Sequence, residues 1–202
     1  YFASECGNLK RVVIPESVIS IRASAFSSSG LSEIYLPESV MTIDDHVFSE
    51  NDNLRSICFP SNLVSLGEDV CSNCDVLEEV FIPGSVPGIP RRAFYGCVAL
   101  KKLEIEEGVE SIGANAFVGC SALEEVEIPN SVTYIGKEAF FYCKGLTGID
   151  IPGSVTSIGA SAFDYCSNLA SVNINDIADW LEIDFVSYAS NPLCNASLYL
   201  NG

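Results

Sequence analysis

Cysteines are the side chains with the widest chemical range in this sequence, and nine are present. Cys71 and Cys74 form a C-x-x-C pair, which could supply half of a zinc site or a redox-active dithiol. No second C-x-x-C exists, and His46 is the only histidine. The competing interpretation, which we favour, is that the cysteines are small buried hydrophobic residues.

Catalysis by a Ser-His-Asp or Cys-His arrangement would also have to use His46, which stands beside Asp44 and Asp45 at a position expected to be exposed. The sequence has no G-x-x-x-x-G-K-[ST] loop, no H-E-x-x-H helix and no G-x-G-x-x-G after a strand. The glutamate pairs at 106–107 and 124–125 are expected to form a solvated face. We therefore predict no enzyme activity, no cofactor and no metal site.

These residues lie on a sequence that repeats itself. A leucine recurs at spacings of 22 residues once and 23 residues thereafter, at Leu9, Leu31, Leu54, Leu77, Leu100, Leu123, Leu146 and Leu169. The consensus unit reads L-x-x-[IV]-x-[IL]-P-x-S-V-x-x-I-G-x-x-A-F-x-x-C-x-x. The closing cysteine is Cys6, Cys74, Cys97, Cys120, Cys143 or Cys166. Repetition at this period is typical of solenoids, in which each unit packs on its neighbours.

Each part of the unit has a physical interpretation. L-x-x-[IV]-x-[IL] alternates as a half-buried strand does, and proline, which has no N–H for a ladder, suits the strand's end. One unit cannot bury its own apolar side, so stacking is required. The predicted fold class is a leucine-rich-repeat solenoid over residues 1–174. We expect about eight 23-residue turns, a parallel sheet on the concave face, and short strands or helical turns on the back.

The same residues carry a family resemblance. The unit with P-x-S-V, I-G-x-x-A-F and a closing Cys resembles the BspA-like (Treponema pallidum-type) leucine-rich repeats over about residues 2–174. The stretch from Ile174 to Gly202 is similar to a segment that interrupts such arrays and leads into further repeats. The resemblance implies a cell-surface or secreted protein with a role in adhesion. It implies no particular ligand.

Several units depart from the pattern. Pro87 and Pro90 fall where a back strand would run, which predicts an irregular turn. Cys71 takes the place of the core phenylalanine, and Ser28 and Asn51 replace the closing cysteine. Neighbouring ladder cysteines would lie about 4.8 Å apart, but parallel Cα–Cβ directions disfavour a relaxed disulfide.

Residues 175–202 are expected to form an irregular segment with a short amphipathic helix at Asp176–Ile183 that contains Trp180. This segment would lead toward further repeats or cap the array. Because the first unit is incomplete and no polar cap precedes it, we expect a monomeric solenoid that is a fragment of a longer chain. Asn195 begins a glycosylation sequon, which matters only in a secreted eukaryotic protein.

The charge balance limits the class of partner. Ten basic residues stand against 27 acidic ones, for a net charge of −17. This balance argues against nucleic acid or an anionic membrane as the partner. No apolar run approaches the roughly 18 residues of a membrane-spanning helix, so we predict no membrane insertion by this segment.

A ligand would be expected on the concave sheet, where outward positions of successive repeats line up. The central column, four residues after each leucine, changes from apolar to acidic: Val13, Tyr35, Cys58, Phe81, Glu104, Glu127, Asp150 and Asn173. Tyr35 and Phe81 are candidate anchors, although repeat drift is the competing explanation. The carboxylates could hold Ca²⁺, but a solvated acidic face is the simpler account. The candidate ligand-binding residues are Val13, Tyr35, Phe81, Glu104, Glu127 and Asp150.

The favoured function is a non-enzymatic adhesion module of a cell-surface or secreted protein. Its partner would be a protein ligand, such as host extracellular matrix or another microbial surface. The alternative is a structural spacer that projects other domains from a cell surface and has no ligand of its own.

Overall fold

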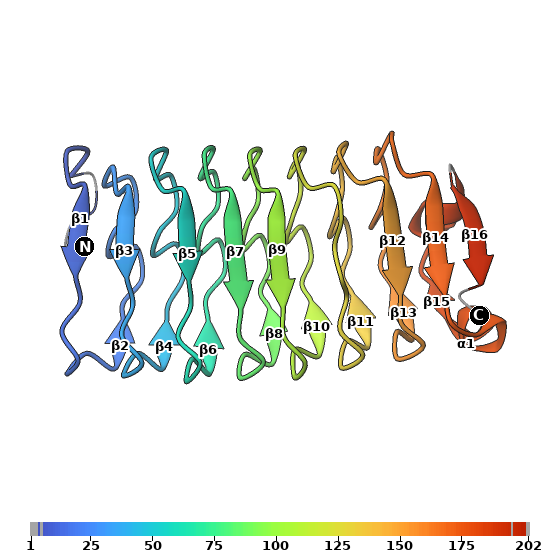
Figure 1. Cartoon of the computed structure of the whole chain (residues 1–202), viewed down its shortest axis with the longest axis horizontal. Helices are drawn as coiled ribbons and strands as arrows, with labels where there is room; N and C mark the ends of the chain where they lie inside the picture. The colour runs from blue at the N-terminus through green and yellow to red at the C-terminus, as the bar shows by residue number, and fades with distance from the viewer. Residues whose placement is uncertain (1–3, 5, 195, 201–202) are drawn as a thin grey trace.

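The chain winds into a stack of coils that runs nearly straight from end to end (Figure 1). The structure, a computed structural model, describes residues 4, 6–194 and 196–200. Strands of one row, here called the front, are β1 (Arg11–Val13), β3 (Glu33–Tyr35), β5 (Ser56–Cys58), β7 (Glu79–Ile82), β9 (Lys102–Ile105), β12 (Gly148–Ile151), β14 (Ser171–Ile174) and β16 (Ser197–Leu200). The back strands are β2 (Ser20–Ile21), β4 (Thr42–Ile43), β6 (Ser65–Leu66), β8 (Gly88–Ile89), β10 (Ser111–Ile112), β11 (Tyr134–Ile135), β13 (Ser157–Ile158) and β15 (Asp184–Phe185).

The strands pair in parallel, each residue with its counterpart in the next coil. Val80 of β7, for example, lies opposite Leu103 of β9, and Ile112 of β10 lies opposite Ile135 of β11. Coil 1 begins at Leu9, and the later repeat leucines begin coils 2 to 8. The prediction of a leucine-rich-repeat solenoid of about eight turns is confirmed.

Stacked side chains fill the centre of the coils. Phe94, Phe117, Phe140 and Phe163 stack in succession, with ring centroids 5.3–5.5 Å apart and nearly parallel planes. In coil 3 the buried Cys71 replaces the ring, and Phe59 of the same coil packs edge-on against Phe94 at 6.4 Å. The aromatic contact is thus kept by a ring from another position.

The Ala-Phe-x-x-Cys part of each coil is a series of hydrogen-bonded turns rather than a regular helix. Residues with positive φ recur there four positions apart, as at Arg92 (φ 55°) and Gly96 (φ 76°). The N–H groups of Arg92, Phe94 and Gly96 donate to carbonyls of the next coil at 2.8–3.0 Å. Equivalent bonds recur from coil 1 to coil 6, so a third ladder joins the coils beside the two sheets.

The closing cysteines form the expected buried ladder from Cys74 to Cys166. The Cys143 thiol donates to the Phe117 carbonyl of the preceding coil at 3.1 Å, and its counterparts do the same. In coil 2, Asn51 makes more bonds: its Nδ2 donates to the Phe26 and Phe48 carbonyls at 2.8 and 2.9 Å, while its Oδ1 accepts from the Leu31 N–H. Cys6, at the start of the chain, is exposed.

Pro87 and Pro90 alter the back sheet less than predicted. The strand β8 forms between them and pairs with β10, but not with β6. In coil 5 the equivalent N–H groups of Glu110 and Gly113 donate to coil 4 at 2.9 and 2.8 Å. Proline has no such N–H, so coil 4 lacks the back-sheet hydrogen bonds to coil 3 but keeps those to coil 5.

The front sheet is interrupted between β3 and β5 and again after β9. The stretch 124–128 was expected to be a strand, but it contributes a single bridge, Glu127 to Asp150. Its core residues Val126 and Ile128 are nevertheless buried. Three of its five residues are glutamates, and glutamate is among the residue types depleted in strands.

The C-terminal segment was expected to be irregular apart from a short helix, but it also contains strands. The expected helix is α1 (Ile177–Glu182), with Asp176 as its N-cap at 2.7 Å from the Ala178 N–H and with Trp180 buried. Beyond it, β15 pairs with β13 and β16 pairs with β14, so both sheets continue. The connection includes the 3₁₀ turns η1 (Tyr188–Ser190) and η2 (Pro192–Cys194). The sequon asparagine, residue 195, lies outside the described residues.

Replacing Asn51 by alanine is expected to destabilise the fold more than replacing Cys143, which occupies the same position in coil 6. Asn51→Ala leaves several buried donors and acceptors unpaired, at about 1–3 kcal/mol each, whereas Cys143→Ala removes one weak thiol donor. Urea unfolding of both variants measures the difference. Equal losses of unfolding free energy would contradict this assignment.

Candidate functional site

The candidate ligand-binding residues lie in one line on the front face. The strand register places the members of the central column opposite one another in turn: Val13 and Tyr35, Cys58 and Phe81, Phe81 and Glu104, Glu127 and Asp150, Asp150 and Asn173. The alternation of each strand buries the residues on either side of these positions and turns the column outward.

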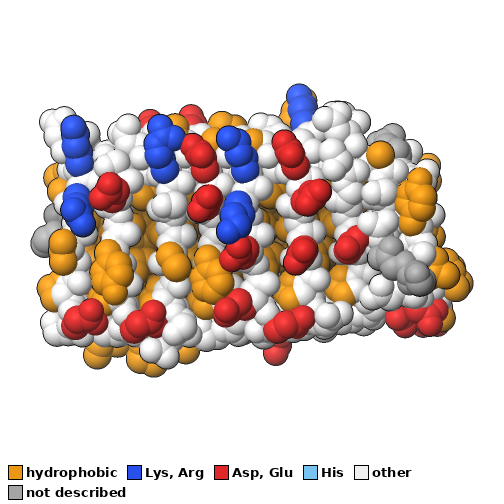
Figure 2. Space-filling model, viewed as in Figure 1, with side chains coloured by type: hydrophobic (Ala, Val, Ile, Leu, Met, Phe, Trp, Pro, Cys, Tyr) orange, Lys and Arg blue, Asp and Glu red, His pale blue; other side chains and the backbone are white. Residues whose placement is uncertain are grey.

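The N-terminal half of this column is apolar and exposed. Val13 and Tyr35 are 74% and 63% exposed, Cys58 is exposed and Phe81 is half-buried. Figure 2 shows a row of orange, hydrophobic side chains across the N-terminal half of this face. Exposed apolar side chains that gather in one row, rather than singly, are typical of interaction surfaces.

The C-terminal half is acidic and only partly neutralised. Glu104 forms an ion pair with Lys102 at 2.7 Å, and this contact raises the pKa of the lysine. Asp150 accepts a hydrogen bond from the Asn173 side chain at 2.6 Å. Within the described part of the chain, Glu127 has no ion-pair or hydrogen-bond partner on its side chain.

Charged side chains flank the apolar half in pairs. Arg11 lies 3.7 Å from Glu33, and Arg55 lies 2.7 Å from Glu78, and each pair joins two successive coils. All four side chains are exposed, so each pair contributes little to stability. The pairs do neutralise the border of the apolar row.

Three hollows follow one another along the front face. One of about 230 Å³ lies over Cys58, Phe81 and Glu104. The next, of about 560 Å³, extends from Phe81 to Glu127, where the sheet is interrupted. A third, of about 340 Å³, runs from Glu127 past Asp150. The central column is therefore the floor of a shallow groove.

Two features were missed by the sequence analysis. Tyr199 of β16 lies opposite Asn173 and extends the central column by one exposed ring. Its signal was the alternating Leu-Tyr-Leu in the tail. On the back, Ile19, Met41 and Val64 form a second exposed apolar row, which follows the Val or Leu of each unit.

The cysteines and His46 do not form an evident reactive centre. Cys71 and Cys74 are fully buried, whereas His46 is exposed on the outer side of coil 2. Among the described residues, no three His, Cys, Asp or Glu side chains come close enough together to hold a metal ion. All nine cysteines lie in the described part of the chain, and all are free thiols.

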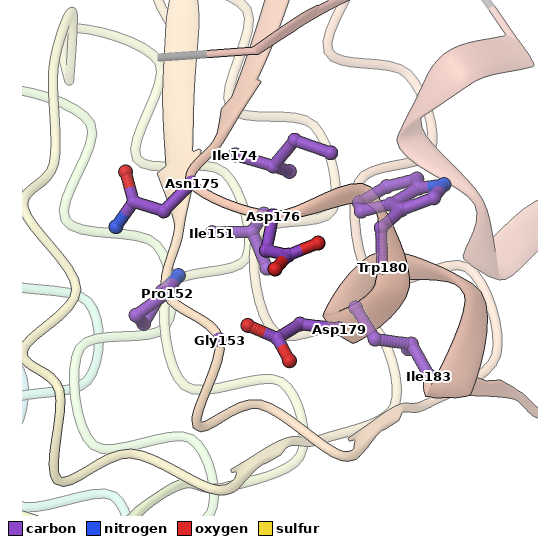
Figure 3. Close-up of a pocket in the computed structure, with 9 residues that line it drawn as sticks. All are labelled: Ile151, Pro152, Gly153, Ile174, Asn175, Asp176, Asp179, Trp180 and Ile183. Carbon is purple, nitrogen blue, oxygen red and sulfur yellow. The ribbon is translucent and has the colours of Figure 1, made fainter. Parts of the chain in front are cut away.

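A narrow gap lies where α1 meets coil 7 (Figure 3), and it has no room for a water molecule. The Asp179 carboxylate points toward Gly153, and a side chain at position 153 would require that carboxylate to move. Trp180 and Ile183 line the other side. This gap is the place where α1 packs against the coils, rather than a binding pocket.

The repeat pattern and the coil geometry agree with one known family. The profile of the BspA type leucine rich repeat region matches residues 1–99 and 87–187, in six copies. The chain belongs to the BspA-type leucine-rich-repeat family. No curated protein matches the chain.

Solved structures of bacterial repeat proteins resemble this BspA-type array. A leucine-rich repeat protein from Eubacterium ventriosum is 29% identical, with a TM-score of 0.74 over 78% of this chain and 43% of its own. The T. pallidum leucine rich repeat protein is 33% identical (TM-score 0.58; 59% and 58% coverage). A leucine rich cell surface protein from Faecalibacterium prausnitzii is 25% identical (TM-score 0.51; 89% and 63%). The chain spans less than two thirds of each.

No helix in the described ranges of this BspA-type chain combines the length and apolar character needed to cross a bilayer.

Thiol reactivity in the native array should separate into two classes. Cys6, Cys58 and Cys194 are exposed, so they should react with iodoacetamide at pH 8, whereas the six buried cysteines should react only in denaturant. Mass spectrometry counts the adducts. More than three adducts on the folded protein would contradict the buried ladder.

The stability of the array should fall at high pH. Burial raises the pKa of the Cys97, Cys120 and Cys143 thiols well above the ordinary value, and that of Cys166 to about 12. Above pH 9 the unfolded thiols lose protons that the folded ones keep, so this contribution is present below pH 9 and is lost as the pH rises toward 12. Thermal melts from pH 7 to 11 test this. A Cys120→Ala/Cys143→Ala variant should show a shallower decline, and an unchanged slope would exclude these thiols as the cause.

Proposed function

We propose that this BspA-type array is a non-enzymatic protein-binding module of a cell-surface or secreted protein, with its ligand on the front face. The observation that supports it is the exposed apolar row of Val13, Tyr35, Cys58 and Phe81 on a sheet otherwise lined by charged and polar side chains. Aromatic side chains at the centre of such a surface are the usual anchors of protein interfaces. The F. prausnitzii neighbour, described as a cell surface protein, supports the location.

Binding of the purified chain to a panel of extracellular-matrix and microbial surface proteins tests this function. The chain is compared with a Tyr35→Glu/Phe81→Glu variant, which places charge on both rings of the row. Loss of two anchors should weaken the interaction more than about thirtyfold. Surface plasmon resonance measures binding, and circular dichroism verifies the fold.

A matched control is Val64→Glu/Tyr134→Glu, which introduces the same two charges at exposed positions on the back. It should bind as the unaltered chain does. Retained binding by the front-face variant would refute the proposed surface. If nothing on the panel binds, the proposal gives way to the spacer function, in which the array only projects other domains.

A further inference from the structure

The front face divides into two halves of different charge. In coils 1 to 4 its flanking positions carry three basic and three acidic residues, namely Lys10, Arg11 and Arg55 against Glu33, Glu78 and Glu79. In coils 5 to 7 the face carries two basic residues against five acidic ones, namely Lys101 and Lys102 against Glu104, Glu124, Glu125, Glu127 and Asp150. An apolar, neutral half therefore adjoins a half with a net charge of −3.

The hollow of about 560 Å³ lies across the boundary between these halves. Its lining includes Phe81 from the apolar side, the carboxylates of Glu104, Glu106, Glu125 and Glu127, and the ammonium groups of Lys101 and Lys102, so carboxylates outnumber ammonium groups there by four to two. The front sheet is interrupted beside β9, and the hollow opens there, where the two kinds of side chain meet. An aromatic face next to carboxylates suits the long, partly apolar side chain of a lysine or arginine, whose charged end can reach the carboxylates.

We infer that the front face docks a polypeptide segment of the partner in which a block of apolar side chains adjoins a block of lysines or arginines. This inference rests on the proposed function. The apolar block lies over Tyr35, Cys58 and Phe81. The basic block lies over Glu125, Glu127 and Asp150 and neutralises their carboxylates. Among these, the Glu127 carboxylate has no partner in the described part of the chain. Charge complementarity of this kind fixes the register of the segment and excludes acidic partners.

The span of the column sets the length of the segment. Six coil-to-coil steps separate Val13 from Asp150, or about 29 Å at about 4.8 Å per step. An extended chain advances about 3.3 Å per residue, so about nine residues cover the column. A probe peptide of twelve residues is therefore long enough.

The test compares two synthetic peptides of identical composition. In the segregated peptide, six residues of leucine and tyrosine precede six residues of lysine and arginine, whereas in the interleaved peptide the two kinds alternate. Both carry the same charge toward a protein with a net charge of −17, so general attraction is equal. Fluorescence anisotropy at physiological salt should give at least about tenfold tighter binding of the segregated peptide.

Two double variants locate the basic block. Glu125→Gln/Glu127→Gln should weaken binding of the segregated peptide about tenfold. The control Glu16→Gln/Glu110→Gln removes the same charge outside the central column and its flanking positions, and it should change binding less than about twofold. Tyr35→Ser should also weaken it, because that ring carries the apolar block. Equal binding of the two peptides, equal effects of the two glutamine variants, or no binding of either peptide would overturn the inference.

The same variants separate this inference from the proposed function. A protein ligand that is lost on Tyr35→Glu/Phe81→Glu but is insensitive to Glu125→Gln/Glu127→Gln leaves the protein-binding function standing and removes the basic block. A ligand lost on both supports the inference and the function together.

Discussion

The stacking of each residue on its counterpart in the next coil is the interaction on which this structure depends. A nearly constant unit length brings equal positions into line, so the rings of Phe94, Phe117 and Phe140 lie face to face inside. The same register lines up the outward positions, and it turns scattered surface residues into continuous columns. Core and candidate binding surface thus follow from one repeat, and a change of unit length would disrupt both together.

Much of the fold could be predicted because the same pattern of strand and turn residues occurs eight times. Local deviations depend on contacts between coils, which the pattern of one unit does not reveal. Pro87 and Pro90 were expected to make their turn irregular, yet each removes only its own N–H, so β8 still pairs with β10. The glutamates of 124–128 fit a strand pattern, but glutamate has a low strand propensity and a single bridge forms there. The pairing of β15 and β16 could not be predicted because the final coil is longer than the others and its sequence no longer follows the repeat unit.

The candidate site was predictable in position but not in depth. Strand alternation was enough to place Tyr35, Phe81 and Glu127 on one surface. Side-chain geometry between coils decides the hollows, the Lys102–Glu104 ion pair and the lack of a partner for Glu127 among the described residues. The apolar row on the back was overlooked because its residues lie outside the strands that were considered.

The interruptions of the ladders are staggered. The back sheet is broken between coils 3 and 4, and the front sheet between coils 2 and 3 and around coil 6, while the turn ladder crosses each of these boundaries. No boundary among coils 1 to 7 lacks all three connections. Where one ladder is interrupted, the coils on either side of the break are still joined by hydrogen bonds of another ladder. An array anchored at one end and pulled at the other would therefore share the load along its length, and would not part at a single weak joint.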